Sequence, residues 1–198
     1  MSAELHQASP RERIVATAMD LFYRQGYKAT GINQIVAEAG VAKASFYDHF
    51  PSKEDLLVAY AVEMARRDIA FIRDEAMKRP SAEERFFAPL EMLKPWFEST
   101  HYRGCPFQNV MVEAPPQATG VHEVARQHRE SFRVFFQELA LDLKNADPAC
   151  RHIDPAAIAT DYIVIFEGSI ALCVAYRATW PLDQAKTMLA KALHHTPA

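Results

Sequence analysis

Apolar residues recur with the period of an α-helix along nearly the whole chain. In the first run they form one stripe, at Ile14, Ala18, Leu21 and Phe22. Ser9 and Pro10 precede this run as a typical N-cap and first helical residue, and Gly26 follows it as a typical C-cap. The pattern therefore predicts an amphipathic helix from about residue 10 to about residue 25.

Two short helices and one long helix are predicted next. The first short helix starts near residue 30 and is stopped by Gly40, and the second covers about residues 42–50. Ser52 then opens a long helix as its N-cap, with acidic side chains in the first turn. This long helix is expected to end near Pro80.

The rest of the chain carries the same helical signals. A capping-box pattern that starts at Ser81 opens a helix in which Pro89 and Pro95 are expected to cause a kink or an early end. Four further helical segments are predicted, over residues 107–113, 121–139, 156–178 and 181–193. No strand or hairpin pattern is found. The sequence therefore predicts an all-α fold, with three helices in the N-terminal part and roughly six more in the C-terminal part.

Composition changes this picture little. The 198 residues are 49% hydrophobic and 24% charged, an ordinary globular balance, and three cysteines are too few and too scattered for a disulfide framework. Residues 1–6 show no cationic segment leading into an apolar one, and no apolar run approaches the roughly 20 residues of a membrane span. These features predict a soluble cytoplasmic protein with no membrane partner.

The net charge gives no sign of a nucleic-acid-binding protein. It is −3 for the chain, and residues 1–55 hold six basic and seven acidic side chains. Any binding to DNA must therefore depend on where a few cations are placed.

Residues 30–53 hold the pattern that points to a function. A helix, a tight turn at Gly40 and a second helix make a helix-turn-helix, and the apolar positions of both helices are placed to pack inward. Six residues are left on the outer face of the second helix: Lys43, Ala44, Ser45, Tyr47, Asp48 and His49. A helix with such a face fits the major groove of DNA, with its first residues at the base edges.

The string GVAKASFYDHFPSKEDLL at residues 40–57 resembles the signature of the tetracycline-repressor (TetR) family of bacterial transcription regulators. The pattern A-x-x-L-F-x-x-x-G-Y at residues 18–27 resembles the same domain, so the resemblance covers about residues 10–57. It implies a DNA-binding domain at residues 1–52 and a ligand-binding and dimerisation domain at residues 53–198. The expected partners are palindromic double-stranded DNA, a second copy of the chain, and a small-molecule effector that releases the DNA.

The resemblance also implies which residues contact DNA. Lys43, Ala44 and Ser45 occupy the base-reading start of the second helix of the motif. Four positions match phosphate contacts of the family: Thr30, Tyr47, His49 and Lys53.

Aromatic and methionine residues are dense in the C-terminal part. In a domain of this kind some of them are expected to line an apolar cavity between helices. The candidates for this ligand pocket are Trp96, Phe107, Met111, Phe136, Tyr162 and Phe166. Polar candidates beside them are His101, Gln108, Asn109, Glu113 and His128, so the expected effector is mostly apolar with one or two polar groups.

The segment 156–178 is apolar on too many sides for a surface helix. Gly168, Ala171 and Ala175 form a small-residue face on it, which permits close approach of another helix. With the last helix, it is expected to form a two-fold four-helix dimer interface. Glu167 would then be a polar group near the interface that needs a partner.

Three other classes of function are alternatives. One is a structural or interaction module with a vestigial DNA-binding domain, against which the retained Lys43, Tyr47, His49 and Lys53 argue. Ser45 and His49 lie four residues apart, but no nucleophile elbow, oxyanion loop or orienting acid accompanies them, so no enzyme and no cofactor are predicted. His101 and Cys105 would share a helix face if the segment were helical, which leaves a redox- or metal-sensing regulator as the alternative. These residues do not supply the three or four ligands of a metal site, so no metal is predicted.

Overall fold

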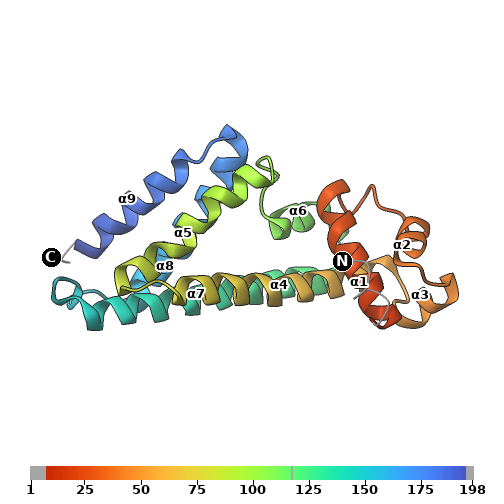
Figure 1. Ribbon diagram of the computed structural model, residues 1–198, viewed down its shortest axis with the longest axis horizontal. Coiled ribbons are helices and arrows are strands. Elements are labelled where there is room, and N and C mark those ends of the chain that lie inside the picture. The colour runs from red at the N-terminus through yellow and green to blue at the C-terminus, as the bar shows by residue number, and fades with distance from the viewer. Residues whose placement is uncertain (1–7, 117, 195–198) are drawn as a thin grey trace. The chain divides into compact units, whose positions relative to one another are not determined.

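The computed structural model of the chain describes residues 8–116 and 118–194, and every regular element in that part is helical. The elements are α1 (Pro10–Gln25), α2 (Ile32–Ala39), α3 (Lys43–His49), α4 (Lys53–Met77), α5 (Ala82–Ser99), α6 (Pro106–Glu113), α7 (Thr119–Ala146), the 3₁₀ turn η2 (Pro148–Cys150), α8 (Pro155–Tyr176) and α9 (Trp180–His194). This confirms the predicted all-α fold (Figure 1). Residues 1–6, on which the expectation of no signal peptide depends, lie outside the described residues.

The chain divides into two compact units, which are described separately. The first unit comprises the chain up to Arg66 together with Pro106–Arg126, and the second comprises Arg67–Cys105 and the chain from Gln127 onward. The helices α4 and α7 each supply residues to both units. These units follow packing and not function, so the predicted functional division between residues 52 and 53 stays a prediction.

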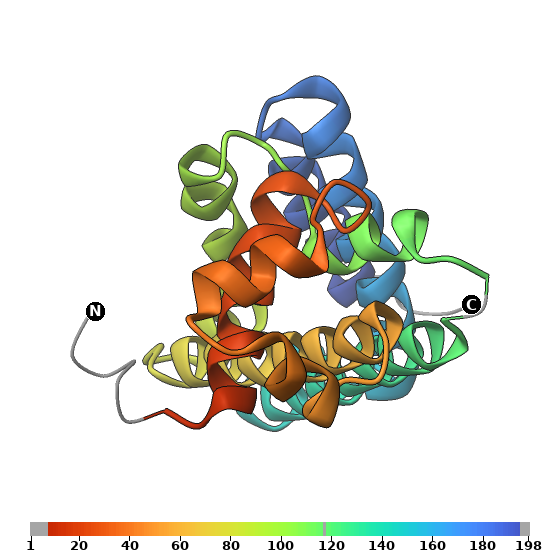
Figure 2. The same ribbon diagram turned by 90° about the vertical axis from the view of Figure 1, so that its right-hand side faces the viewer.

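Helices α1, α2 and α3 pack together in the first unit around a shared apolar core. The ribbons of these three helices are red to orange in Figures 1 and 2. Its fully buried members include Ile14, Leu21, Ile35, Phe46 and Leu56. At the start of α1, Ser9 Oγ accepts a hydrogen bond from the Glu12 N–H (3.3 Å), and the Glu12 carboxylate accepts one from the Ser9 N–H (2.8 Å). This capping box begins the helix where the sequence predicts it.

The second unit has a core that contains closely packed aromatic rings from α5, α7 and α8. The rings are Phe86, Phe97, Phe132, Phe135, Phe136, Tyr162 and Phe166. Pro89 and Pro95 lie inside α5, which nevertheless runs unbroken from Ala82 to Ser99, so the expected early end of this helix is wrong. The Pro89 side chain is buried, and it lacks the N–H with which other residues in a helix donate a backbone hydrogen bond.

Helix α8 differs from the prediction that no apolar run approaches the length of a membrane span. Within the part of the chain that the structure describes, it is the one helix long and apolar enough to cross a membrane by length and composition alone. The core helix of a soluble protein passes the same test, and one face of α8, including Tyr162, Phe166 and Ile170, is buried in the second unit. The length and composition of α8 are therefore weak evidence for a membrane span.

Candidate DNA-binding interface

The turn between α2 and α3 is built on a single glycine. Gly40 has φ +61°, in the left-handed region, and its N–H donates to the Ala37 carbonyl (3.2 Å). The Val41 N–H donates to the Val36 carbonyl (3.2 Å), which completes the hydrogen-bond pattern of a glycine-terminated helix. This turn ends α2 abruptly and lets α3 begin at Lys43.

Helix α3 is fixed by one buried ring and leaves the opposite face in solvent. The Phe46 side chain is fully buried, and its ring lies edge-to-face with Tyr47, at 5.3 Å between centroids. The Tyr47 side chain is 44% exposed despite this contact. Lys43, Ala44 and His49 are also exposed and Ser45 is half-buried, so five of the predicted DNA contacts share the open face of one short helix.

Thr30 is placed differently from the other predicted contacts. Its side chain is buried, and Oγ1 donates a hydrogen bond to the Gly26 carbonyl at 2.8 Å. The hydroxyl therefore stabilises the connection between α1 and α2. Its role as a phosphate contact stays a prediction.

Lys53 is directed toward the same connection. Its Nζ donates to the Tyr27 carbonyl at 2.6 Å and lies 4.1 Å from the centroid of the Tyr27 ring. Burial lowers the pKa of this ammonium, an effect that the charges of Glu54 and Glu113 oppose. The Tyr27 hydroxyl in turn donates to Glu54 (3.1 Å), and burial together with this carboxylate raises the pKa of the phenol. Any phosphate that bound the Lys53 ammonium would have to compete with these partners.

Glu113, at the end of α6, is a residue of this network that the sequence analysis placed beside the ligand pocket. Its carboxylate accepts a hydrogen bond from the Lys28 N–H at 2.9 Å. It also packs against Gly26, whose φ is +95°, so closely that a Cβ there would lie 2.8 Å from Oε1. Lys28 and Glu113 are 85 positions apart in the chain, so no local pattern in the sequence predicts this hydrogen bond.

The six predicted pocket residues fall in both units. Phe107 and Met111 lie on α6 in the first unit, and Phe107 is fully buried. The other four lie in the second unit, where three form one cluster: Phe136 stacks on Tyr162 at 4.0 Å between centroids and meets Phe166 edge-to-face at 5.4 Å. Trp96 is half-buried beside this core. Whether these residues bind an effector stays a prediction.

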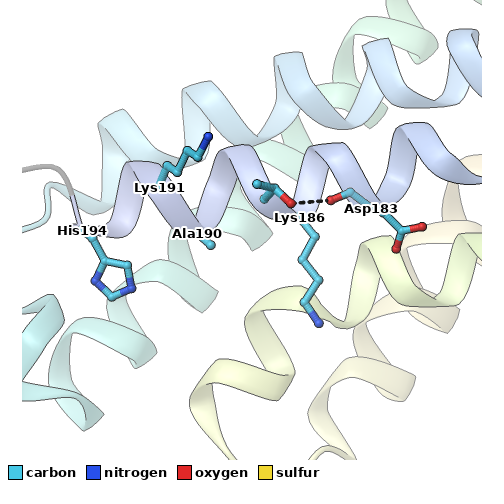
Figure 3. Close-up of a pocket in the computed structure, with 6 residues that line it drawn as sticks. Asp183, Lys186, Ala190, Lys191 and His194 are labelled. Atoms are coloured by element: carbon cyan, nitrogen blue, oxygen red, sulfur yellow. Dashed lines mark hydrogen bonds between the residues drawn. The ribbon is translucent and has the colours of Figure 1, made fainter.

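Two surface hollows of the second unit have different chemistry. The first is open and charged and runs along α9, lined by Asp183, Lys186, Thr187, Ala190, Lys191 and His194 (Figure 3). The second is an apolar groove between α8 and α9, whose lining includes Val164, Gly168, Leu172, Trp180 and Met188. Neither is lined by a predicted pocket residue. The charged hollow includes ion-paired side chains, since Lys186 pairs with Glu91 (2.6 Å) and Asp183 pairs with Lys94.

The geometry does not favour the redox- or metal-sensing alternative. Helix α5 ends at Ser99, so His101 and Cys105 do not share a helix face as that alternative supposed. Cys150 and Cys173 are buried, and burial raises the pKa of both thiols. Among residues 8–116 and 118–194, no three His, Cys, Asp or Glu side chains form a group that could hold a metal ion.

The fold and the exposed face of α3 define a helix-turn-helix DNA-binding protein. Residues 14–60 match the bacterial regulatory proteins of the tetR family, and residues 82–189 match the tetracyclin repressor-like C-terminal domain. The second match alone covers more than half of the sequence, and the chain therefore belongs to the TetR family of transcriptional regulators, which are not enzymes.

Relatives match over nearly the full length. The chain is 26% identical to the HTH-type transcriptional repressor DhaR of Mycobacterium sp. (strain GP1), over 92% of this chain and 91% of that protein. It is 29% identical to the HTH-type transcriptional regulator LmrA of Bacillus subtilis (strain 168), over 87% and 90%. The crystal structure of a TetR-family regulator from Streptomyces coelicolor superposes with a TM-score of 0.77 and 26% identity, covering 94% of this chain and 89% of that one.

Proposed function

We propose that this protein is a cytoplasmic transcriptional repressor that binds a palindromic operator as a homodimer and releases it when a small, mostly apolar molecule binds. The observation that carries the DNA-binding part is the open face of α3, where Lys43, Tyr47 and His49 are exposed on a helix anchored by Phe46. DhaR, which is similar to this chain over nearly its full length, is a transcriptional repressor, and this supports repression over activation.

The residues of α3 divide into two roles. Lys43, Ala44 and Ser45 form the first turn of the helix, the part that reaches base edges in the major groove. Tyr47, His49 and Lys53 follow and are assigned to phosphates, which position the protein without reading sequence. Thr30 belongs with them as a fourth phosphate position, although its side chain is occupied with Gly26.

The homodimer is proposed to form through α8 and α9. Gly168, Ala171 and Ala175 are all exposed, and a Cβ at Gly168 would meet nothing within 4 Å. Val164 and Tyr176 flank this strip with side chains 67% and 60% exposed, an apolar surface that a second copy would cover. On α9 the expected interface is narrower than its sequence suggests, because Leu182, Ala185 and Leu189 are buried in the core of their own unit and Met188 remains exposed.

Glu167 has a partner within its own chain. Arg129 of α7 approaches its carboxylate at 3.1 Å, and both side chains are partly buried. This ion pair supplies the partner that a carboxylate beside an apolar interface requires.

The proposed release works through the spacing of two recognition helices. An effector can act only if it binds one dimer geometry better than another. Helix α4 begins four residues after α3 ends and supplies residues to both units, so a change in its tilt would alter the separation of the two α3 helices. A duplex accepts such helices at about 34–36 Å, one helical turn of DNA.

Selection of duplexes from a random-sequence library tests the DNA-binding part. We expect a two-fold symmetric consensus, bound by two chains for each duplex. The variant Lys43→Ala should bind selected and scrambled duplexes more equally, because a side chain at a base edge provides about 1–3 kcal/mol of discrimination. Lys191→Ala, which removes the same charge from α9, should retain the wild-type preference. Failure of the wild-type protein to bind any duplex would refute the proposal.

A further inference from the structure

The connection between α1 and α2 is held by two groups of opposite charge. On one side, Lys53 Nζ donates to the Tyr27 carbonyl at 2.6 Å. On the other, the Glu113 carboxylate accepts from the Lys28 N–H at 2.9 Å and packs against Gly26. The three residues 26–28 thus bind an ammonium and a carboxylate at once. All of these residues belong to the first unit.

Lys53 is held by several weak restraints. The carbonyl of Tyr27 is a neutral acceptor, the Tyr27 ring lies under the ammonium at 4.1 Å, and the negative charges of Glu54 and Glu113 act on it through space. Glu54 is adjacent in sequence, and its carboxylate accepts the Tyr27 hydroxyl. Glu113 alone among these partners comes from α6, the helix that follows α5 in the chain (Figure 1).

We propose that Glu113 restrains DNA binding by holding Lys53 on the α1–α2 connection, so that loss of the Glu113 charge frees Lys53 for a DNA phosphate. A DNA phosphate competes for the Lys53 ammonium with the Tyr27 carbonyl and with the negative charge of Glu113. Removing a nearby negative charge shifts this competition toward the phosphate. The inference rests on the proposed role of Lys53 as a phosphate contact and adds a regulating residue on a different helix.

The variant Glu113→Gln isolates the charge from the geometry. A glutamine has the same length, and its amide oxygen can still accept the Lys28 N–H, so the connection keeps its hydrogen bond. Glu113→Asp is the complementary variant, because it keeps the charge and shortens the side chain. Glu98→Gln serves as the matched control, since Glu98 is an exposed carboxylate at the end of α5 in the second unit.

Fluorescence anisotropy with a mixed-sequence 30-base-pair duplex, at salt concentrations from 50 to 200 mM, provides the measurement. It needs neither the operator nor the effector. For Glu113→Gln we expect tighter binding at 50 mM salt and a salt slope steeper by about 0.9, which makes the loss of affinity across this range about 3.5-fold larger than for the wild type. Glu113→Asp and Glu98→Gln should keep the wild-type slope.

A double-mutant cycle with Lys53→Met separates this restraint from general electrostatics. Because Glu113 withholds Lys53 from phosphate in the wild type, Lys53→Met alone should leave the salt slope nearly unchanged, and adding it to Glu113→Gln should remove the gain of about 0.9. An effect of Glu113→Gln that persists without Lys53, or an unchanged slope in Glu113→Gln, would overturn the restraint while leaving DNA binding intact. A slope that Lys53→Met alone lowers by about 0.9 would show that Lys53 already binds a phosphate in the wild type, and would remove the restraint while keeping the phosphate assignment.

Discussion

Phe136 and Tyr162 stack face to face in the second unit, with ring centroids 4.0 Å apart and ring planes 8° apart. The buried Tyr162 hydroxyl donates to the Phe86 carbonyl at 2.8 Å, so this ring is held both at its face and at its end. Burial raises the pKa of the phenol well above its ordinary value, which keeps it a hydrogen-bond donor at any physiological pH. An effector that reaches these residues therefore meets rings already packed against one another.

Tyr162→Phe should reduce the free energy of unfolding by about 1–3 kcal/mol, because the Phe86 carbonyl loses a buried donor. Urea unfolding followed by circular dichroism measures the change. Tyr176→Phe makes the same chemical change at a side chain that is 60% exposed, and it should stay within about 0.5 kcal/mol of the wild type. Equal stability of the two variants would show that the Tyr162 hydroxyl contributes nothing to the core.

His101→Gly should stabilise the protein. Helix α5 ends at Ser99, and His101 just beyond it has φ +52°; the His101 N–H donates to the Glu98 carbonyl (3.3 Å), and the Tyr102 N–H donates to the Phe97 carbonyl (2.9 Å). Glycine usually occupies this left-handed position, which costs other residues about 1–2 kcal/mol. Because glycine gives the unfolded chain about 0.4–1 kcal/mol of extra entropy, we expect a net gain of about 0.5–1 kcal/mol.

His101→Ala is the control for this prediction, since alanine keeps the strain and should bring no gain. The same helix end shows the usual contact that accompanies such a cap, because Tyr102 stacks on Phe97 at 5.8 Å. A stabilisation by alanine equal to that by glycine would place the cause in the imidazole side chain and not in the backbone.

Local patterns predicted local structure well in this chain. The left-handed Gly40 ends α2, and the capping pair of Ser52 and Asp55 opens α4, with the Asp55 N–H donating to Ser52 Oγ at 3.0 Å. Each of these features depends on residues at most four positions apart, which is the range that sequence periodicity and capping rules cover. The outer face of α3 could be predicted for the same reason, because it depends only on the helical period of residues 43–49.

Features that depend on distant residues could not be predicted. Glu113 was grouped with the pocket because nothing near it in sequence indicates a contact with Lys28. The inward position of Lys53 likewise depends on Tyr27, which lies 26 residues earlier. Periodicity indicates on which face of a helix an apolar or charged residue lies. Which distant residue it contacts depends on how the helices pack.

Native alkylation should distinguish the three cysteines, none of which forms a disulfide. Burial raises the pKa of Cys173 to about 11, so about a thousandth of it is thiolate at pH 8, against about a quarter for an ordinary thiol. Cys150 is also buried with a raised pKa, and Cys105 is partly exposed. Iodoacetamide at pH 8 should therefore modify Cys105 first, as read by mass spectrometry of tryptic peptides.

The rate at Cys173 should rise as pH increases from 8 toward 11, since only the thiolate reacts. In denaturant all three cysteines should react at similar rates, which is the control for intrinsic reactivity. Rapid modification of Cys173 in the native protein at pH 8 would contradict its place in the core.

Gly168→Leu should convert the proposed homodimer to a monomer while leaving each chain folded. A side chain at Gly168 meets nothing within 4 Å in its own chain, so a leucine there has no intramolecular clash. It would nevertheless hold two helices apart where the small residues of α8 permit close approach. Sedimentation velocity should show the mass of one chain, and the circular dichroism spectrum should remain helical. Affinity for a two-site duplex should fall when the dimer is lost, because the two recognition helices are no longer linked.

Glu98→Leu is the control, because it adds the same side chain at an exposed position in the second unit and should remain dimeric. An intact dimer of Gly168→Leu would move the interface away from this face of α8.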